Sequence, residues 1–360
     1  MKLPSLFPAF ALLVQTASAG VRLEPLAKLE GSADTTTIVN LLFSPDGKTV
    51  ITGDFSGAIW SWDVARGKEK KLAQFAKAEI WDLDLSPDGK ELAVAAVGDA
   101  SSQLARFDVL TGKVSGSITM REVILGSVRY HPAGKVLATD NTDNKGSGVR
   151  FWNRADWPVK EGVEQKRVKG IDVPMKDRAG QNVEVSYMEF TPDRKLLVTA
   201  SDEPRLRIWS LPDGKPFGRL DNPGTTPLTT IAVSSQGKGV VVACGQHDMV
   251  VWEIATKKLL GHHRAGDGEG KWSARAAGIS PDGIHIVSSF YKGKPDPEDD
   301  NHGTGLLIWN VPLGGAPVFE LDDAHSGADI NLVRFSPGGK MVATAAGDGS
   351  IRLWKIVVSE

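Results

Sequence analysis

Cysteine is almost missing from this chain of 360 residues, which contains Cys244 and no other. A disulfide within the chain, a paired-cysteine metal site and covalent haem attachment are therefore excluded. Strong net charge is missing as well, because 42 Lys and Arg residues nearly balance 44 Asp and Glu residues. A nearly neutral surface does not favour nucleic acid or an anionic membrane as a partner. We expect no cofactor and no nucleic-acid partner.

No apolar run is long enough to cross a bilayer, which takes about 20 residues. The run Leu6–Val14 follows Lys2 and precedes Ala17-Ser18-Ala19, which is the pattern of a secretory signal peptide. We expect residues 1–19 to be removed after Ala19, leaving a soluble, monomeric protein in the periplasm or outside the cell. A buried apolar segment at the N-terminus is the alternative interpretation.

A short turn motif recurs seven times in the remaining chain. Six copies have proline in second place, and most continue with Asp-Gly-Lys or a close variant, as in Ser44-Pro45-Asp46-Gly47-Lys48. Proline presets φ and glycine accepts the left-handed conformation, so each copy predicts a tight turn between two strands. The copies begin at Ser44, Ser86, His131, Thr191, Ser234, Ser280 and Ser336.

A third strand in each unit ends in a large aromatic residue, and a less regular fourth strand follows. Successive units are 42 to 60 residues apart, which is the period of a four-stranded β-propeller blade. Such a sheet needs a stacked neighbour on each side to bury its faces, so the pattern predicts an all-β protein. The aromatic residues are Trp62, Phe107, Trp152, Trp209, Trp252, Trp309 and Trp354.

These units resemble WD repeats over residues 22–356. The resemblance rests on Ser-Pro-Asp-Gly-Lys at Ser44 and Ser86, on Trp62-Asp63, and on Asp348-Gly349-Ser350-Ile351-Arg352-Leu353-Trp354. It implies a single seven-bladed propeller over residues 20–360, similar to exported WD-repeat proteins of the bacterial type. It also implies a scaffold that binds a protein or peptide and is not an enzyme.

The two ends of the chain predict how the ring closes. The last unit lacks a fourth strand after Trp354, whereas Arg22–Leu29 is a strand with no unit of its own. We expect this N-terminal strand to complete the last blade, which removes exposed sheet edges.

The resemblance further implies a structural hydrogen-bond network inside one blade. The last unit matches it best, through His325, Thr344, Asp348 and Trp354. We interpret these four residues as a buried network that stiffens the blade, and not as catalytic residues.

Binding is expected where the units differ, because long loops on a rigid scaffold usually carry it. Trp152 and Thr191 are 39 residues apart, and we expect the extra residues mainly between the fourth strand and the next blade. The candidate loops are Val163–Asn182 and Tyr291–Thr304, both on one face. The candidate contact residues are Trp81, Arg275, Asn331, Lys176, Arg178 and Tyr291.

Three alternatives remain open. The acidic residues 296–300 offer oxygen ligands for calcium, but their spacing is not that of a known calcium loop, and we assign no metal site. Charged residues two positions before the turns either line the channel for a polar ligand or neutralise one another, as Asp84 with Arg129 and Arg129 with Glu189. A hydrolase or lactonase with its site at the channel mouth is the alternative function.

Overall fold

The computed structural model describes residues 20–29, 37–99, 101–143, 146–157, 163–164, 170–174, 183–224, 226–228, 230–237, 239–245, 248–264, 274–292 and 303–358. The predicted signal peptide lies outside these residues. Across the described ranges, no helix is long and apolar enough to cross a membrane.

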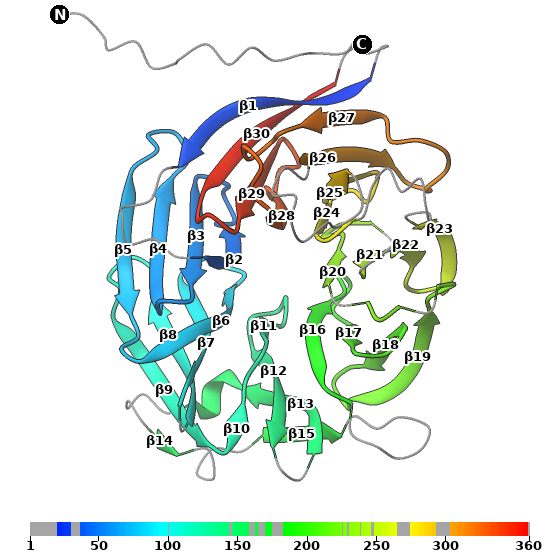
Figure 1. Ribbon diagram of the computed structural model, residues 1–360. Coiled ribbons are helices and arrows are strands. Elements are labelled where there is room, and N and C mark those ends of the chain that lie inside the picture. The colour runs from blue at the N-terminus through cyan, green and yellow to red at the C-terminus, as the bar shows by residue number, and fades with distance from the viewer. Residues whose placement is uncertain are drawn as a thin grey trace, which may run out of the picture.

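Seven antiparallel sheets stand around a central axis as the blades of a propeller (Figure 1). This arrangement confirms the predicted fold class. Blade 1 contains β2 (Ile38–Phe43), β3 (Thr49–Asp54), β4 (Ala58–Asp63) and β5 (Glu69–Gln74). Blade 2 contains β6 (Ala78–Leu85), β7 (Glu91–Gly98), β8 (Ser101–Asp108) and β9 (Val114–Arg121). Blade 3 contains β11 (Val128–Tyr130), β12 (Val136–Asp143), β13 (Gly146–Asn153) and β15 (Gly170–Pro174), and β10 (Val123–Ile124) also pairs with β12.

The other four blades follow the same order. Blade 4 contains β16 (Val185–Phe190), β17 (Leu196–Ser201), β18 (Arg205–Ser210) and β19 (Lys215–Asp221). Blade 5 contains β20 (Thr230–Val233), β21 (Val240–Cys244), β22 (Asp248–Glu253) and β23 (Lys258–Arg264). Blade 6 contains β24 (Ala277–Ile279), β25 (His285–Lys292), β26 (Gly303–Asn310) and β27 (Phe319–Asp322). Blade 7 contains β28 (Ile330–Phe335), β29 (Met341–Ala346), β30 (Ile351–Val358) and β1 (Val21–Leu29).

The N-terminal strand closes the ring, as the sequence predicts. β1 pairs antiparallel with β30 from Val21 opposite Val358 to Leu29 opposite Ile351 (Figure 1). One apolar core cluster lies between each pair of neighbouring blades, and the cluster between blades 7 and 1 includes Leu29 and Leu41. The closing interface is therefore packed like the other six.

The recurring turn motif has a direct structural reason. The Ser44 hydroxyl donates to Asp46 at 2.6 Å and accepts the backbone N–H of Thr49 at 2.9 Å, while Gly47 has a φ of 69°. Serine and aspartate thus satisfy the turn internally, and glycine provides the left-handed residue. Ser86 with Asp88 and Ser280 with Asp282 repeat the arrangement.

In five blades the tryptophan of the third strand is fixed by a hydroxyl on the second strand. The Trp62 indole N–H donates to Thr52 at 3.1 Å, and Trp152, Trp209, Trp309 and Trp354 make the same bond to Thr139, Thr199, Ser288 and Thr344. Phe107 has no N–H to satisfy, and Val94 takes the position of the hydroxyl in blade 2. In blade 2 phenylalanine thus replaces tryptophan on the third strand, and valine replaces the hydroxyl residue on the second strand.

One prediction about the insertions is wrong. The extra residues after Trp152 do not lie mainly beyond the fourth strand of blade 3, because that strand is β15 itself and residues 154–169 precede it. Within this stretch β14 (Val163–Glu164) pairs in parallel with β9 on the outer edge of blade 2. The described part of the range 163–182 therefore consists of the strands β14 and β15, and residues 165–169 and 175–182 lie outside the described residues.

Candidate functional site

A cavity of about 560 Å³ opens at one end of the channel, on the face where the first strands begin. We call this cavity the mouth. Its wall includes residues of blades 1, 2, 3, 4 and 7, among them Phe55, Trp81 and Ile124. These three large apolar side chains are 46%, 41% and 49% exposed, although most large apolar residues of the protein are buried. Exposed apolar surface from blades 1, 2 and 3 therefore lines part of the mouth, and no described part of the chain covers it.

A β-bulge explains why Trp81 faces outward. The pairing of β6 with β7 shifts between Ile80 and Asp82, which leaves Trp81 as the extra residue. Similar shifts in β2, β16 and β28 fall at Val39, Ser186 and Asn331, and all four bulged residues line the mouth. A bulge turns one side chain away from the regular alternation of a strand. Blades 1, 2, 4 and 7 thus each present one bulged residue to the mouth at the same point of the repeat.

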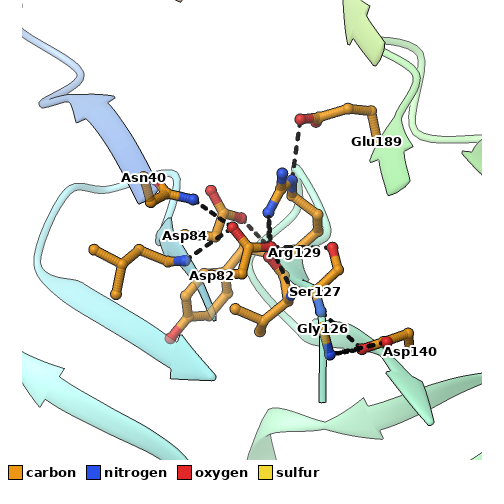
Figure 2. Close-up of polar contacts among 11 residues, drawn as sticks. Asn40, Asp82, Asp84, Gly126, Ser127, Arg129, Asp140 and Glu189 are labelled. Carbon is orange, nitrogen blue, oxygen red and sulfur yellow. Dashed lines mark hydrogen bonds and ion pairs between the residues drawn. The ribbon is translucent and has the colours of Figure 1, made fainter. Parts of the chain in front are cut away.

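Asp82 is the centre of a buried polar network beneath the mouth (Figure 2). It accepts hydrogen bonds from the Asn40 side-chain amide of blade 1 and from the Ser127 hydroxyl of blade 3, the latter at 3.0 Å. It also accepts the backbone N–H groups of Leu83 and Val128 and pairs with the Arg129 guanidinium. One carboxylate therefore joins three blades at the channel.

Arg129 extends the network to blade 4, because its Nε donates to Glu189 at 3.0 Å. Burial lowers the pKa of Arg129, but the charges of Asp82, Glu189 and Asp84 outweigh burial and raise it above its usual value. The predicted pair of Arg129 with Glu189 is present. The predicted pair with Asp84 is replaced by Asp82, because Asp84 instead accepts the backbone N–H of Tyr130.

Two further carboxyl groups lack a direct cation in the described network. Burial raises the pKa of Asp84 to about 7, against the lowering effect of Arg129. Burial also raises the pKa of Asp140 to about 7, although Asp140 accepts the backbone N–H groups of Ser127 at 2.7 Å and Gly126 at 2.8 Å. The channel thus contains more carboxyl groups than its cationic side chains pair with.

The candidate contact residues that the structure describes do not form one site. Trp81 and Asn331 line the mouth. Arg275 and Tyr291 meet on the same face, where the Arg275 guanidinium lies 5.0 Å from the Tyr291 ring and 3.3 Å from Asp329. Lys176, Arg178 and residues 293–302, including the acidic segment, lie outside the described residues. No group of three or more His, Cys, Asp or Glu in the described part is placed to hold a metal ion.

In blade 7 the structure brings together three of the four network residues. The Thr344 hydroxyl lies 2.7 Å from His325 Nε2 and accepts the Trp354 indole N–H at 2.9 Å. Asp348 differs from the expectation, because it is exposed and accepts the backbone N–H of Ser350 at 2.9 Å. The Ser350 hydroxyl meets His325 Nδ1 at 2.7 Å instead. Burial lowers the pKa of His325 to about 4, which keeps it neutral in the network.

Phe55 and Ile124 are mouth residues that the sequence pattern does not single out. Phe55 lies in the turn between β3 and β4, and Ile124 lies in the two-residue strand β10. Neither belongs to a repeated position with an aromatic or charged signature. An apolar residue inside an otherwise polar turn is the one signal that points to Phe55.

Comparison with known proteins supports a WD-repeat propeller. Residues 23–63, 175–210 and 315–355 match the family described as WD domain, G-beta repeat. The propeller domain of Cps50 (Swd1) from Myceliophteria thermophila has the same fold, with a TM-score of 0.71 and 15% identity over 93% of this chain and 100% of that domain.

Relatives are similar over much of the chain at low identity. The WD repeat-containing protein WDS homolog of Arabidopsis thaliana is 23% identical over 87% of this chain and 54% of its own length. SIR4-interacting protein SIF2 of Saccharomyces cerevisiae is 25% identical over 75% of this chain and 48% of its own length. The target of rapamycin complex subunit wat1 of Schizosaccharomyces pombe is 21% identical over 60% of each. The chain thus spans about half of the first two relatives.

Two of these relatives are named as an interacting protein and as a subunit of a complex. The sources of the three relatives are a plant and two yeasts. They therefore give no support to the expectation of an exported WD-repeat protein of the bacterial type.

Proposed function

We propose that this protein is an exported scaffold, not an enzyme, and that it binds a protein or peptide segment at the mouth. One observation carries the proposal: Phe55, Trp81 and Ile124, from three successive blades, stand exposed around one cavity. Exposed apolar clusters rimmed by polar groups are typical of interaction sites, and tryptophan is enriched among residues that dominate binding energy.

A hydrogen-bond network fixes the side chains at the base of the mouth. Asp82 has five hydrogen-bond donors from blades 1, 2 and 3, and Arg129 continues the network to Glu189 of blade 4. A surface that is ordered before binding loses less conformational entropy when a partner docks. The network thus supports recognition of a defined segment and not of apolar surface in general.

A Trp81→Ala variant tests the site. Dodecamer peptides selected by the full chain from a random phage-displayed library are the probe, and fluorescence anisotropy measures their binding. We expect Trp81→Ala to weaken binding about 30-fold or more, as the loss of a dominant contact does. Phe217→Ala is the matched control, because Phe217 is a similarly exposed aromatic residue on β19 that does not line the mouth. Equal effects of the two changes would place binding elsewhere.

Export rests on the signal-peptide pattern of residues 1–19. When the full coding sequence is expressed in a secreting host, we expect the protein in the exported fraction to begin at Gly20. N-terminal sequencing measures the cleavage point. Recovery of the chain inside the cell with Met1 and Lys2 intact would argue against export while leaving the binding proposal untouched.

A further inference from the structure

We propose that the partner segment carries a basic side chain, lysine or arginine, and places it against the wall formed by blades 3 and 4. This inference rests on the proposed function and adds the chemistry of the partner. It follows from the charges around the mouth, an unsatisfied acceptor in its wall and the aromatic surface beside it.

Acidic groups outnumber basic groups around the mouth and the channel beneath it. The acidic residues are Asp82, Asp84, Asp140, Glu184 and Glu189, and the basic residues are Arg129 and Arg334. Arg129 lies against Asp82 and Glu189. Asp140 and Glu184, both in the wall of the mouth, have no ion pair within the described residues. A cation from a partner would therefore meet carboxyl groups that no cation of the described chain pairs with.

A buried acceptor in the same wall also calls for a donor. Asn40 is only 5% exposed and lines the mouth, and its side-chain nitrogen donates to Asp82. Its side-chain oxygen has no hydrogen-bond partner among the described residues. Buried polar atoms are normally satisfied, because leaving one without a partner is costly. The wall beside Asp82 thus has one more hydrogen-bond acceptor than it has donors, which favours a donor-bearing partner group over a carboxylate.

Aromatic surface next to these groups suits a long basic side chain. Trp81 is exposed beside the mouth, and Tyr187 of blade 4 lies half-buried in its wall. Lysine and arginine lay their aliphatic stems on such surface, and their charged heads are attracted to aromatic faces. Burial already raises the pKa of Asp140, and a neighbouring cation would favour its ionised form.

Arg334 fixes the side of the mouth on which the basic group lies. Arg334 belongs to β28 of blade 7, and its guanidinium donates to the backbone oxygen of Val333 at 3.1 Å. This fixed positive charge repels a second cation. The basic side chain therefore lies toward Asp140 and Glu184, and not toward blade 7.

The experiment uses the peptides that the full chain selects and that require Trp81 for binding. Each lysine or arginine in them is replaced in turn by norleucine or citrulline, and affinities are measured for the unchanged protein and two charge-reversal variants. Glu184→Lys adds positive charge to the wall of the mouth. Asp202→Lys is the matched control, because Asp202 is an exposed residue in the turn between β17 and β18 of the same blade and does not line the mouth.

We expect one basic position in the peptides, whose replacement weakens binding about tenfold, and we expect Glu184→Lys to cause a similar loss. Asp202→Lys should leave affinity unchanged. The inference is wrong if Trp81-dependent peptides lack a basic residue, tolerate its replacement, or bind both charge-reversal variants equally well. If no selected peptide depends on Trp81, the proposed function fails first, which separates the two failures.

Discussion

Replacing Leu29 by alanine is expected to lower the free energy of unfolding by about 2–5 kcal/mol, the usual loss when a buried leucine is truncated. Leu29 is fully buried in the core cluster between blades 7 and 1, where it lies with Leu41 and Ile351. The change removes packing from the interface that closes the ring. Denaturant unfolding followed by tryptophan fluorescence gives the free energy for both proteins.

Leu26 provides a control in the same strand. It lies in β1 three residues earlier but is 42% exposed, so Leu26→Ala should change stability by less than about 0.5 kcal/mol. Deletion of residues 20–29 should have a larger effect than either substitution, because β30 then loses its antiparallel partner. An unchanged melting temperature after this deletion would refute the closed ring.

The Arg129→Met variant should be destabilised by about 3–5 kcal/mol, because removing one partner of a buried ion pair leaves the other charge uncompensated. Asp82 and Arg129 are both buried, so the variant leaves the Asp82 carboxylate without its guanidinium partner. The loss should appear in equilibrium unfolding at neutral pH. It should exceed the loss from Arg66→Met, whose pair with Asp63 is exposed at the surface.

A double variant separates charge from packing in this prediction. Asp82→Asn removes the carboxylate charge but retains a side-chain oxygen that accepts hydrogen bonds. Arg129→Met combined with Asp82→Asn should therefore be more stable than Arg129→Met alone. If the double variant is less stable by the sum of both single changes, the two residues do not interact as described.

Most of the fold could be predicted from the sequence, because its signals are local. Ser44, Asp46 and Gly47 form their turn through bonds within five residues, so the motif itself specifies the structure. The tryptophan that ends the third strand bonds to a hydroxyl on the adjacent strand. Closure was predictable because a strand without a blade and a blade without a strand occur at opposite ends of the chain.

The remaining features depend on contacts between distant segments. The distance from Trp152 to Thr191 gives the total number of inserted residues but not the connection that holds them. The parallel pairing of β14 with β9 joins two blades and has no local signature. Asp82 and Asp84 lie two residues apart on β6, and the sequence does not tell which carboxylate reaches Arg129.

The lining of the mouth follows only in part from the sequence. The position of Trp81 and Asn331 relative to the turn places them at the end of an inner strand, and both line the mouth. Phe55 and Ile124 carry no such signal, because exposure around the cavity depends on how neighbouring blades pack.

In four blades a bulged residue lies five positions before the turn, and this position separates recognition from folding. Val39, Trp81, Ser186 and Asn331 occupy it with four unlike side chains, yet the strands around them keep the same pairing. Substitutions at these positions change the side chains that a partner contacts at the mouth and leave the packing inside each blade unchanged. The residues at these four positions can therefore be exchanged, in evolution or by design, to change the partner while the fold of the blades is kept.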